Sequence, residues 1–131
     1  GGKPFFAEVR RTGRHEASID AVAAGAIDVA AIDAVTFALI SRYQPARVVN
    51  VRVLGFTAPV PGLPLITSIH TPARELQRLR HALERLTGDP RLDDLRRRLL
   101  IKGYSSLELS AYAALAEQEA SAAAAGYGLL A

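Results

Sequence analysis

The segment Ile27-Asp28-Val29-Ala30-Ala31-Ile32 decides the fold expected for this chain. It is a short, nearly continuous apolar run between turn-forming residues, which is typical of a strand buried on both faces of a parallel sheet. Residues 15–24 precede it with apolar side chains at helical spacing, and Asp33 follows it where an aspartate can cap a second helix. This alternation of helix and strand predicts an α/β fold.

Three further segments extend the strand pattern along the chain. Residues 5–11, 48–54 and 65–69 are rich in Phe, Val, Ile or Leu and are predicted to be strands. Between the last two, residues 55–64 hold three prolines and two glycines, which indicates a stiff irregular connector.

Helices are predicted from apolar spacing together with capping residues. Gly25 should end the first helix, and Asp33 should begin a second whose inner face carries Phe37, Ile40 and Tyr43. Later in the chain, a helix capped by Thr71 should carry a leucine stripe, and Asp89-Pro90 should open a short one. A capping box at Ser105-Ser106-Leu107-Glu108 predicts the start of the final helix, which can run to Ala125. The leucine stripe consists of Leu76, Leu79, Leu83 and Leu86.

Composition excludes several classes of protein. Half of the 131 residues are apolar, which is too many for a disordered chain, and no apolar run reaches the roughly 18 residues of a membrane span. There is no cysteine, so a disulfide framework and a thiolate metal site are excluded. The net charge is +3, but arginine and acidic residues are interleaved over 74–98, which indicates a solvated surface and no nucleic-acid partner. Because position 1 is not methionine, we expect a processed or truncated chain.

Motifs for catalysis are absent from the sequence. It contains no Gly-x-Gly-x-x-Gly, no phosphate-binding P-loop, no His-Glu-x-x-His and no Gly-x-Ser-x-Gly. His15, His70 and His81 are separated and lack a carboxylate at convincing metal-ligand spacing. We therefore expect no catalytic residue, no metal and no cofactor, and an enzyme is not favoured.

The candidate binding residues lie in the turn Thr12-Gly13-Arg14-His15, between a predicted strand and a helix. First-turn amides of a helix lack intrahelical partners and face a partial positive charge, so an oxyanion can bind there. A glycine permits close approach to the backbone, and Thr12, His15 or Ser18 can add hydrogen bonds. An ordinary turn between strand and helix is the alternative interpretation.

Asp33 and Thr36 repeat this arrangement at the end of the next predicted strand. In the simpler interpretation, Asp33 only caps the helix and Thr36 only lies in its first turn. Because ligands bind at the carboxyl ends of strands in open parallel sheets, the two turns could share one crevice.

Several of these segments together resemble a known family. They include His15-Glu16-Ala17-Ser18-Ile19, Val22-Ala23-Ala24-Gly25, Asp28-Val29-Ala30-Ala31-Ile32-Asp33 with Thr36, Leu54-Gly55-Phe56 with Pro59, Pro61 and Pro64-Leu65, Gly103-Tyr104 and Gly126-Tyr127. In this order they resemble the phosphate/phosphite/phosphonate-binding proteins, the periplasmic solute-binding components of ABC importers. The resemblance covers only the C-terminal portion of a family member.

The resemblance implies part of a type II periplasmic-binding fold, in which two lobes close on a ligand. Residues 1–56 would then be part of the second lobe, 57–68 a crossover connector, and 69–131 C-terminal helices that return to the first lobe. The implied location is the periplasm, either free or as a membrane-anchored lipoprotein, with the signal sequence absent from this chain.

The implied function is the capture of a small phosphorus oxyanion (phosphate, phosphite or phosphonate) and its delivery to an ABC permease. His15 would donate a hydrogen bond to the oxyanion. Arg14 replaces a residue that is usually small or an amide, and Leu63 replaces an acidic residue found in binders of aminoalkyl ligands. The loss of that carboxylate favours a simpler oxyanion.

Other functions remain open at this point. The same fold also serves as a ligand-sensing domain or as the body of biosynthetic enzymes, and a fold does not fix a function. A helical interaction module built from the leucine stripe and the final helix is a second alternative. Unpaired strand edges would also favour a homo-oligomer.

Overall fold

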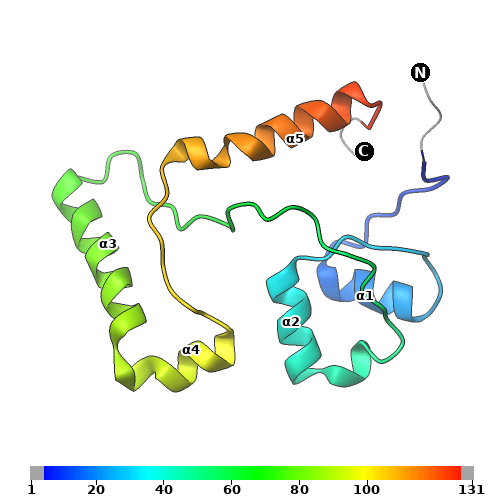
Figure 1. Ribbon diagram of the computed structural model, residues 1–131, viewed down its shortest axis with the longest axis horizontal. Coiled ribbons are helices and arrows are strands. Elements are labelled where there is room, and N and C mark those ends of the chain that lie inside the picture. Colours follow the sequence, from blue (N-terminus) through cyan, green and yellow to red (C-terminus); the bar gives the residue numbers. More distant parts are fainter. Residues whose placement is uncertain (1–4, 128–131) are drawn as a thin grey trace. The chain divides into compact units, whose positions relative to one another are not determined.

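The computed structural model describes residues 5–127, which form five α-helices and three short 3-10 helices (Figure 1). The chain divides into two compact units. The first unit is Arg10–Phe56, and the second contains the described residues before and after it.

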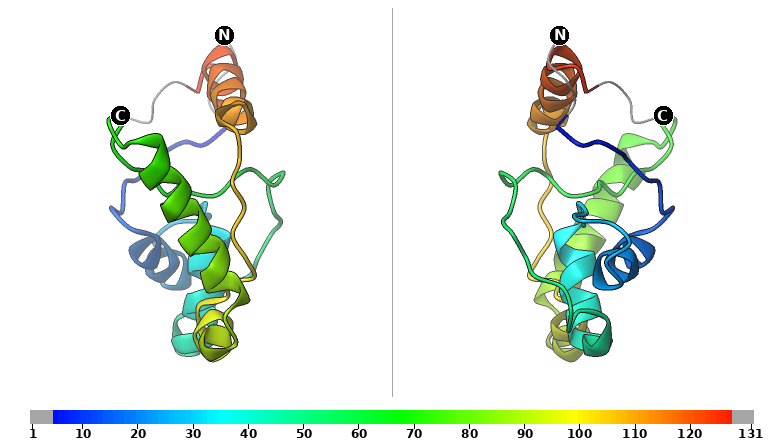
Figure 2. Two further views of the ribbon diagram at one scale, coloured as in Figure 1. Left: turned by 90° about the vertical axis from the view of Figure 1, so that its left-hand side faces the viewer. Right: turned by 90° about the vertical axis from the view of Figure 1, so that its right-hand side faces the viewer.

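The first unit is built from α1 (His15–Ala23), α2 (Ala34–Tyr43) and the 3-10 helix η1 (Pro45–Arg47). Helices α1 and α2 lie side by side, and η1 contacts both of them (Figure 2). Ile19 of α1 is 1% exposed and Ile40 of α2 is 5% exposed. In the described part of the chain these two side chains are the only buried ones, so the core of the unit is the seam between α1 and α2.

The predicted ends of these helices are largely confirmed. Gly25 adopts φ +69° directly after α1, in the left-handed conformation that glycine adopts at low cost. Asp33 caps α2, and Ile40 and the half-buried Phe37 face inward as predicted. The prediction for Tyr43 is wrong, because its side chain is exposed and its ring lies under the Arg42 guanidinium.

The second unit contains α3 (Ala73–Gly88), η2 (Pro90–Leu92), α4 (Asp93–Leu99), η3 (Leu109–Tyr112) and α5 (Ala113–Ala124). The leucine stripe lies on α3 as predicted. Thr71 does not cap α3, because Pro72 occupies the N-cap position and the Thr71 hydroxyl is hydrogen-bonded to Thr67 at 2.8 Å.

The predicted capping box at residues 105–108 is not formed. Glu108 stands at the N-cap position of η3 without a side-chain hydrogen bond, and α5 begins only at Ala113. The Ser-x-x-Glu spacing therefore does not define the start of this helix, since the first turn there closes as a 3-10 helix.

The predicted α/β fold is not confirmed, since residues 5–127 contain helices and no strand. Residues 27–32 and 65–69 have no regular structure, and residues 48–50 form a turn in which the Val51 N–H donates to the Val48 carbonyl. A strand exists only where its backbone groups pair with a neighbouring strand, whereas a helix pairs its own. The apolar composition of these segments did not by itself produce that pairing.

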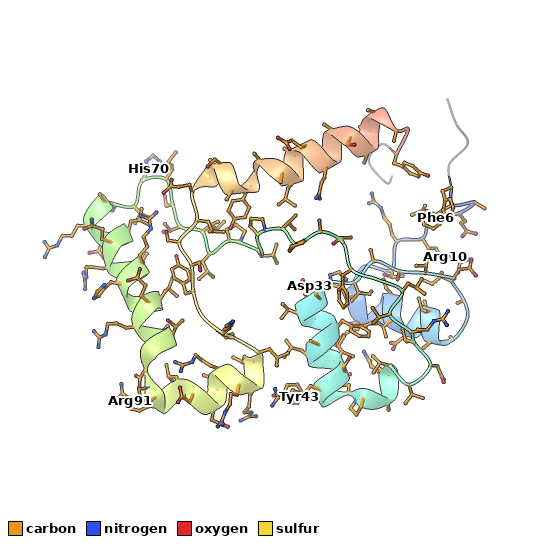
Figure 3. The ribbon with its side chains drawn as sticks, in the orientation of Figure 1. Phe6, Arg10, Asp33, Tyr43, His70 and Arg91 are labelled. Carbon is orange, nitrogen blue, oxygen red and sulfur yellow. The ribbon has the colours of Figure 1, made fainter. Side chains whose placement is uncertain are left out.

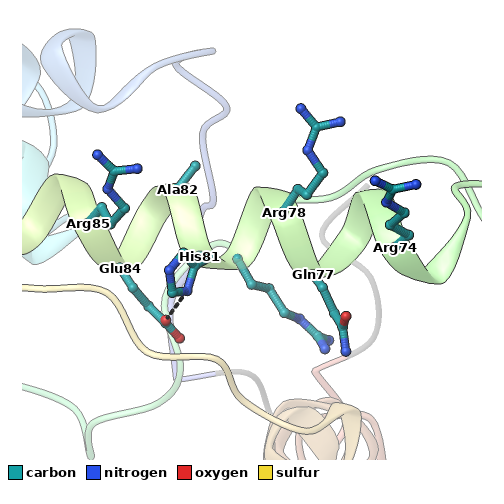
Figure 4. A pocket seen from close by; sticks show the side chains of 8 residues that line it. Arg74, Gln77, Arg78, His81, Ala82, Glu84 and Arg85 are labelled. Atoms are coloured by element: carbon teal, nitrogen blue, oxygen red, sulfur yellow. Dashed lines mark ion pairs between the residues drawn. The ribbon is translucent and has the colours of Figure 1, made fainter.

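The mixed charges over residues 74–98 form ion pairs along exposed helices, as expected. Arg78 contacts Glu75 at 2.9 Å and Arg97 contacts Asp94 at 3.4 Å, each pair three residues apart on its helix. A shallow hollow on α3 is lined by residues of that helix alone, including His81, which pairs with Glu84 at 3.6 Å (Figure 4). No helix within residues 5–127 is both long and apolar enough to cross a bilayer.

Candidate functional site

The turn before α1 is shaped by Gly13 and Arg14. Gly13 has φ +81°, and Arg14 is extended with φ −160° at the N-cap position. The Ser18 N–H donates to the Arg14 carbonyl at 3.2 Å, which closes the first turn of α1. The N–H groups of the preceding first-turn residues have no acceptor within the helix, so this end of α1 can hydrogen-bond an anion.

Two of the predicted hydroxyl groups meet beside this turn. The Thr12 and Ser18 hydroxyl oxygens are 2.5 Å apart, and the Thr12 hydroxyl also donates to the Arg14 carbonyl at 3.3 Å. When Thr12 donates to that carbonyl, Ser18 donates to Thr12, because a hydroxyl carries one proton. The structure therefore brings Thr12 and Ser18 together across the N-terminal turn of α1.

Asp33 and Thr36 form the N-terminal cap of α2. The Thr36 N–H donates to the Asp33 Oδ2 at 2.7 Å, and Asp33 lies at the start of α2 in Figure 3. This backbone hydrogen bond, with one from the Thr36 side chain, lowers the pKa of the Asp33 carboxyl below 3.8. The simple capping interpretation of Asp33 is thus confirmed as a structural role, whatever else the carboxylate does.

Helices α1 and α2 contact each other, and an electrostatic interaction joins residues at their N-terminal ends. The charge of His15 contributes to lowering the pKa of Asp33, after the hydrogen bonds from Thr36. A histidine on one helix end therefore lies within electrostatic range of the carboxylate that caps the other. Gly13 and Arg14 belong to the same turn as His15, and the Arg14 side chain is exposed.

Sequence reasoning missed one charged residue of this unit. Arg47 lies on η1, and its guanidinium contacts Glu16 and Asp20 of α1, each at 3.8 Å. These partners are about thirty residues away in the sequence, so no local spacing pointed to them.

Metal binding receives no support from the described residues. Within 5–127, no group of three or more His, Asp or Glu residues could hold a metal ion. His70 and His81 are both exposed and lie in the second unit.

Comparison with known proteins gives the family. The family described as "ABC transporter, phosphonate, periplasmic substrate-binding protein" has a model that matches residues 2–112. The chain therefore belongs to this family of periplasmic substrate-binding components of ABC transporters, and the resemblance expected from its sequence is confirmed. No curated protein and no solved structure matches the chain.

Family membership also supports several coarse expectations for the chain. The family implies a periplasmic-binding fold, a periplasmic location and a role in binding a phosphonate ligand for transport, and its members are generally not enzymes.

Proposed function

We propose that the chain contributes to capturing a small phosphorus oxyanion (phosphate, phosphite or phosphonate) for delivery to an ABC permease. Besides the family, the observation that supports this most is the turn before α1, where Gly13 and the first-turn amides of α1 lie beside the paired Thr12 and Ser18 hydroxyls. The N-terminal end of α1 carries a partial positive charge that attracts an anion, whereas the N-terminal end of α2 is already occupied by the Asp33 carboxylate.

In the proposed site, the first-turn amides of α1 and the His15 side chain donate to the oxyanion. Gly13 leaves space beside the backbone, because a Cβ placed there would meet no atom within 4 Å. Ser18 and Thr12 supply hydroxyl groups from the same turn. Arg14 adds a positive charge, while Asp33 and Thr36 bound the site on the side of α2.

We further propose that residues 1–56 form part of a second lobe, that 57–68 are a crossover connector, and that 69–131 return to the first lobe. The separate unit Arg10–Phe56 supports a boundary near residue 56, whereas the described residues before Arg10 group with the second unit. Residues 1–4 and 128–131 of these ranges lie outside the described residues. Ligand capture would then involve closure of the two lobes. In the periplasm, the protein would be either free or anchored to the membrane as a lipoprotein.

Isothermal titration of the full-length protein with phosphate, phosphite and methylphosphonate tests the proposal. Aminoethylphosphonate should bind no better than methylphosphonate, because Leu63 carries no carboxylate for an ammonium group. Sulfate is the control for a generic anion. Absence of heat from all three phosphorus oxyanions would contradict the proposed function.

Self-association of the chain is a separate part of the proposal. Leu63, Ile66 and Ile69 are 101%, 87% and 93% exposed, and such apolar surface favours association with a second copy. Light scattering across a concentration series should therefore show a dimer or a larger species. A monomer throughout the series would contradict it.

A further inference from the structure

We propose that Arg47 is a positioning residue for the oxyanion site: it ties α1 to the segment that follows α2 and thereby fixes the orientation of the His15 turn. This inference rests on the proposed function. Arg47 itself does not belong to the turn that would hold the ligand, so it would act through α1.

The contacts of Arg47 reach two successive turns of α1. Its Nη1 lies 3.8 Å from Glu16 Oε1, and its Nη2 lies 3.8 Å from Asp20 Oδ2. Glu16 and Asp20 are four residues apart, so they lie on one face of the helix, and Glu16 directly follows His15. A guanidinium with two separate nitrogens can hold both carboxylates at once, which resists rotation of α1 about its axis.

Burial distinguishes this arginine from an ordinary surface cation. The Nη1 atom is buried and makes no hydrogen bond, although the side chain as a whole is 36% exposed. A buried donor without a hydrogen bond costs free energy, so this geometry is not the one that would maximise stability. We therefore attribute to Arg47 an effect on the orientation of α1. Its guanidinium offsets the repulsion between the Glu16 and Asp20 carboxylates, which are four residues apart on the helix.

Arg47 connects α1 to the segment that follows α2. Arg47 ends η1, whose first residue Pro45 follows α2 with one residue between. Because η1 contacts both helices, the ion pairs from Arg47 of η1 to α1 restrain α1 relative to α2. The relative placement of His15 and Asp33 depends on that restraint.

The first experiment compares methylphosphonate binding by variants of the full-length protein. Arg47→Met should weaken binding roughly tenfold, and Arg47→Lys should restore part of it. The charge-matched control is Arg52, an exposed arginine of the same unit, and Arg52→Met should bind as the unchanged protein does. Glu16→Gln combined with Arg47→Met should lose little more than Arg47→Met alone. An affinity unchanged in Arg47→Met, with the unchanged protein binding, overturns the inference and leaves the proposed function standing.

The second experiment needs no ligand. Hydrogen exchange of the Ser18 amide, which donates to the Arg14 carbonyl, reports opening of the first turn of α1. Arg47→Met should speed this exchange several-fold relative to the Ile40 amide of α2, whereas Arg52→Met should not. Equal acceleration at both sites indicates general destabilisation and overturns the positioning role, as does no acceleration at Ser18. If the unchanged protein binds none of the oxyanions, the proposed function fails, and the exchange rates still decide whether Arg47 orients α1.

Discussion

His15 begins α1, Asp33 caps α2, and the charge of His15 helps to lower the pKa of the Asp33 carboxyl. The two residues are eighteen positions apart in the sequence, yet each stands at the N-terminal end of its helix. At the α2 end, the Asp33 carboxylate already offsets the partial positive charge of the helix, whereas no side chain caps the α1 end.

Replacement of Asp33 by alanine should destabilise the first unit. The variant loses the acceptor of the Thr36 N–H, and loss of an N-cap side chain costs about 1 kcal/mol. Urea unfolding followed by circular dichroism measures the change. Asp33→Asn is the control, because asparagine caps a helix about as well, and an equal loss in both variants would contradict the capping role.

The Asp33 carboxyl should also make stability depend on acidity. Its folded pKa lies below the unfolded value of 3.8, so its contribution is complete above that value and is lost as the pH falls through the folded pKa. Unfolding free energy should therefore drop less between about pH 5 and pH 2 in Asp33→Asn than in the unchanged chain. Parallel curves for the two proteins would show that Asp33 does not contribute to the acid response.

Replacement of Gly13 by alanine should strain the turn before α1. A Cβ there meets no atom within 4 Å, but φ is +81°, so the cost is conformational and about 1 kcal/mol. Gly55→Ala is the matched control in the same unit, because its Cβ also meets open space and its φ is not in the left-handed range. Thermal unfolding that shows equal effects of both substitutions would argue against strain at Gly13.

Thr12 and Ser18 should behave as one unit in stability measurements. Thr12→Val leaves the Ser18 hydroxyl without its partner at 2.5 Å and should cost about 1 kcal/mol, and Ser18→Ala should cost a similar amount. The double variant should lose little more than either single one, because the same hydrogen bond is removed. A double-mutant cycle by urea unfolding measures this, and additive losses would exclude the coupling.

His15→Ala should weaken oxyanion binding by about 1–3 kcal/mol if the imidazole donates to a buried oxyanion. His81→Ala is the control, since His81 lies on α3 in the other unit and its side chain is 76% exposed. Titration calorimetry with methylphosphonate compares the two. Equal affinities for His15→Ala and the unchanged protein would remove His15 from the proposed site.

Helices could be predicted from the sequence where a local signal defines them. Gly25 and Asp33 mark helix ends through backbone conformation and a single side-chain hydrogen bond, both of which depend on neighbouring residues. The capping signals failed at two positions. The Thr71 hydroxyl is hydrogen-bonded to Thr67 and does not cap α3, and after Glu108 the chain first forms a 3-10 turn before α5 begins. A capping residue has several possible partners, and spacing alone does not select among them.

Strand pairing and the arrangement of the candidate site depend on residues far apart in the sequence, and the spacing of residues within one segment does not reveal such contacts. The apolar run at residues 27–32 indicates a strand only if other strands lie beside it, and residues 5–127 contain none. Among the candidate binding residues, the turn at Gly13 and the cap at Asp33 could be identified locally. The contact of Arg47 with α1 could not, because it joins residues about thirty positions apart that only the packing of η1 on the two helices brings together.

The hydrogen bond between the Thr12 and Ser18 hydroxyls affects which anions the proposed site selects. Both hydroxyls already have a partner, and the Thr36 N–H is likewise donated to Asp33. A ligand that takes either donor replaces an acceptor of the protein, so binding there is an exchange in which the number of hydrogen bonds stays nearly constant. Selectivity at these donors then follows the acceptor strength of the anion: a charged phosphonate oxygen competes well against the neutral Thr12 hydroxyl, and less well against the Asp33 carboxylate.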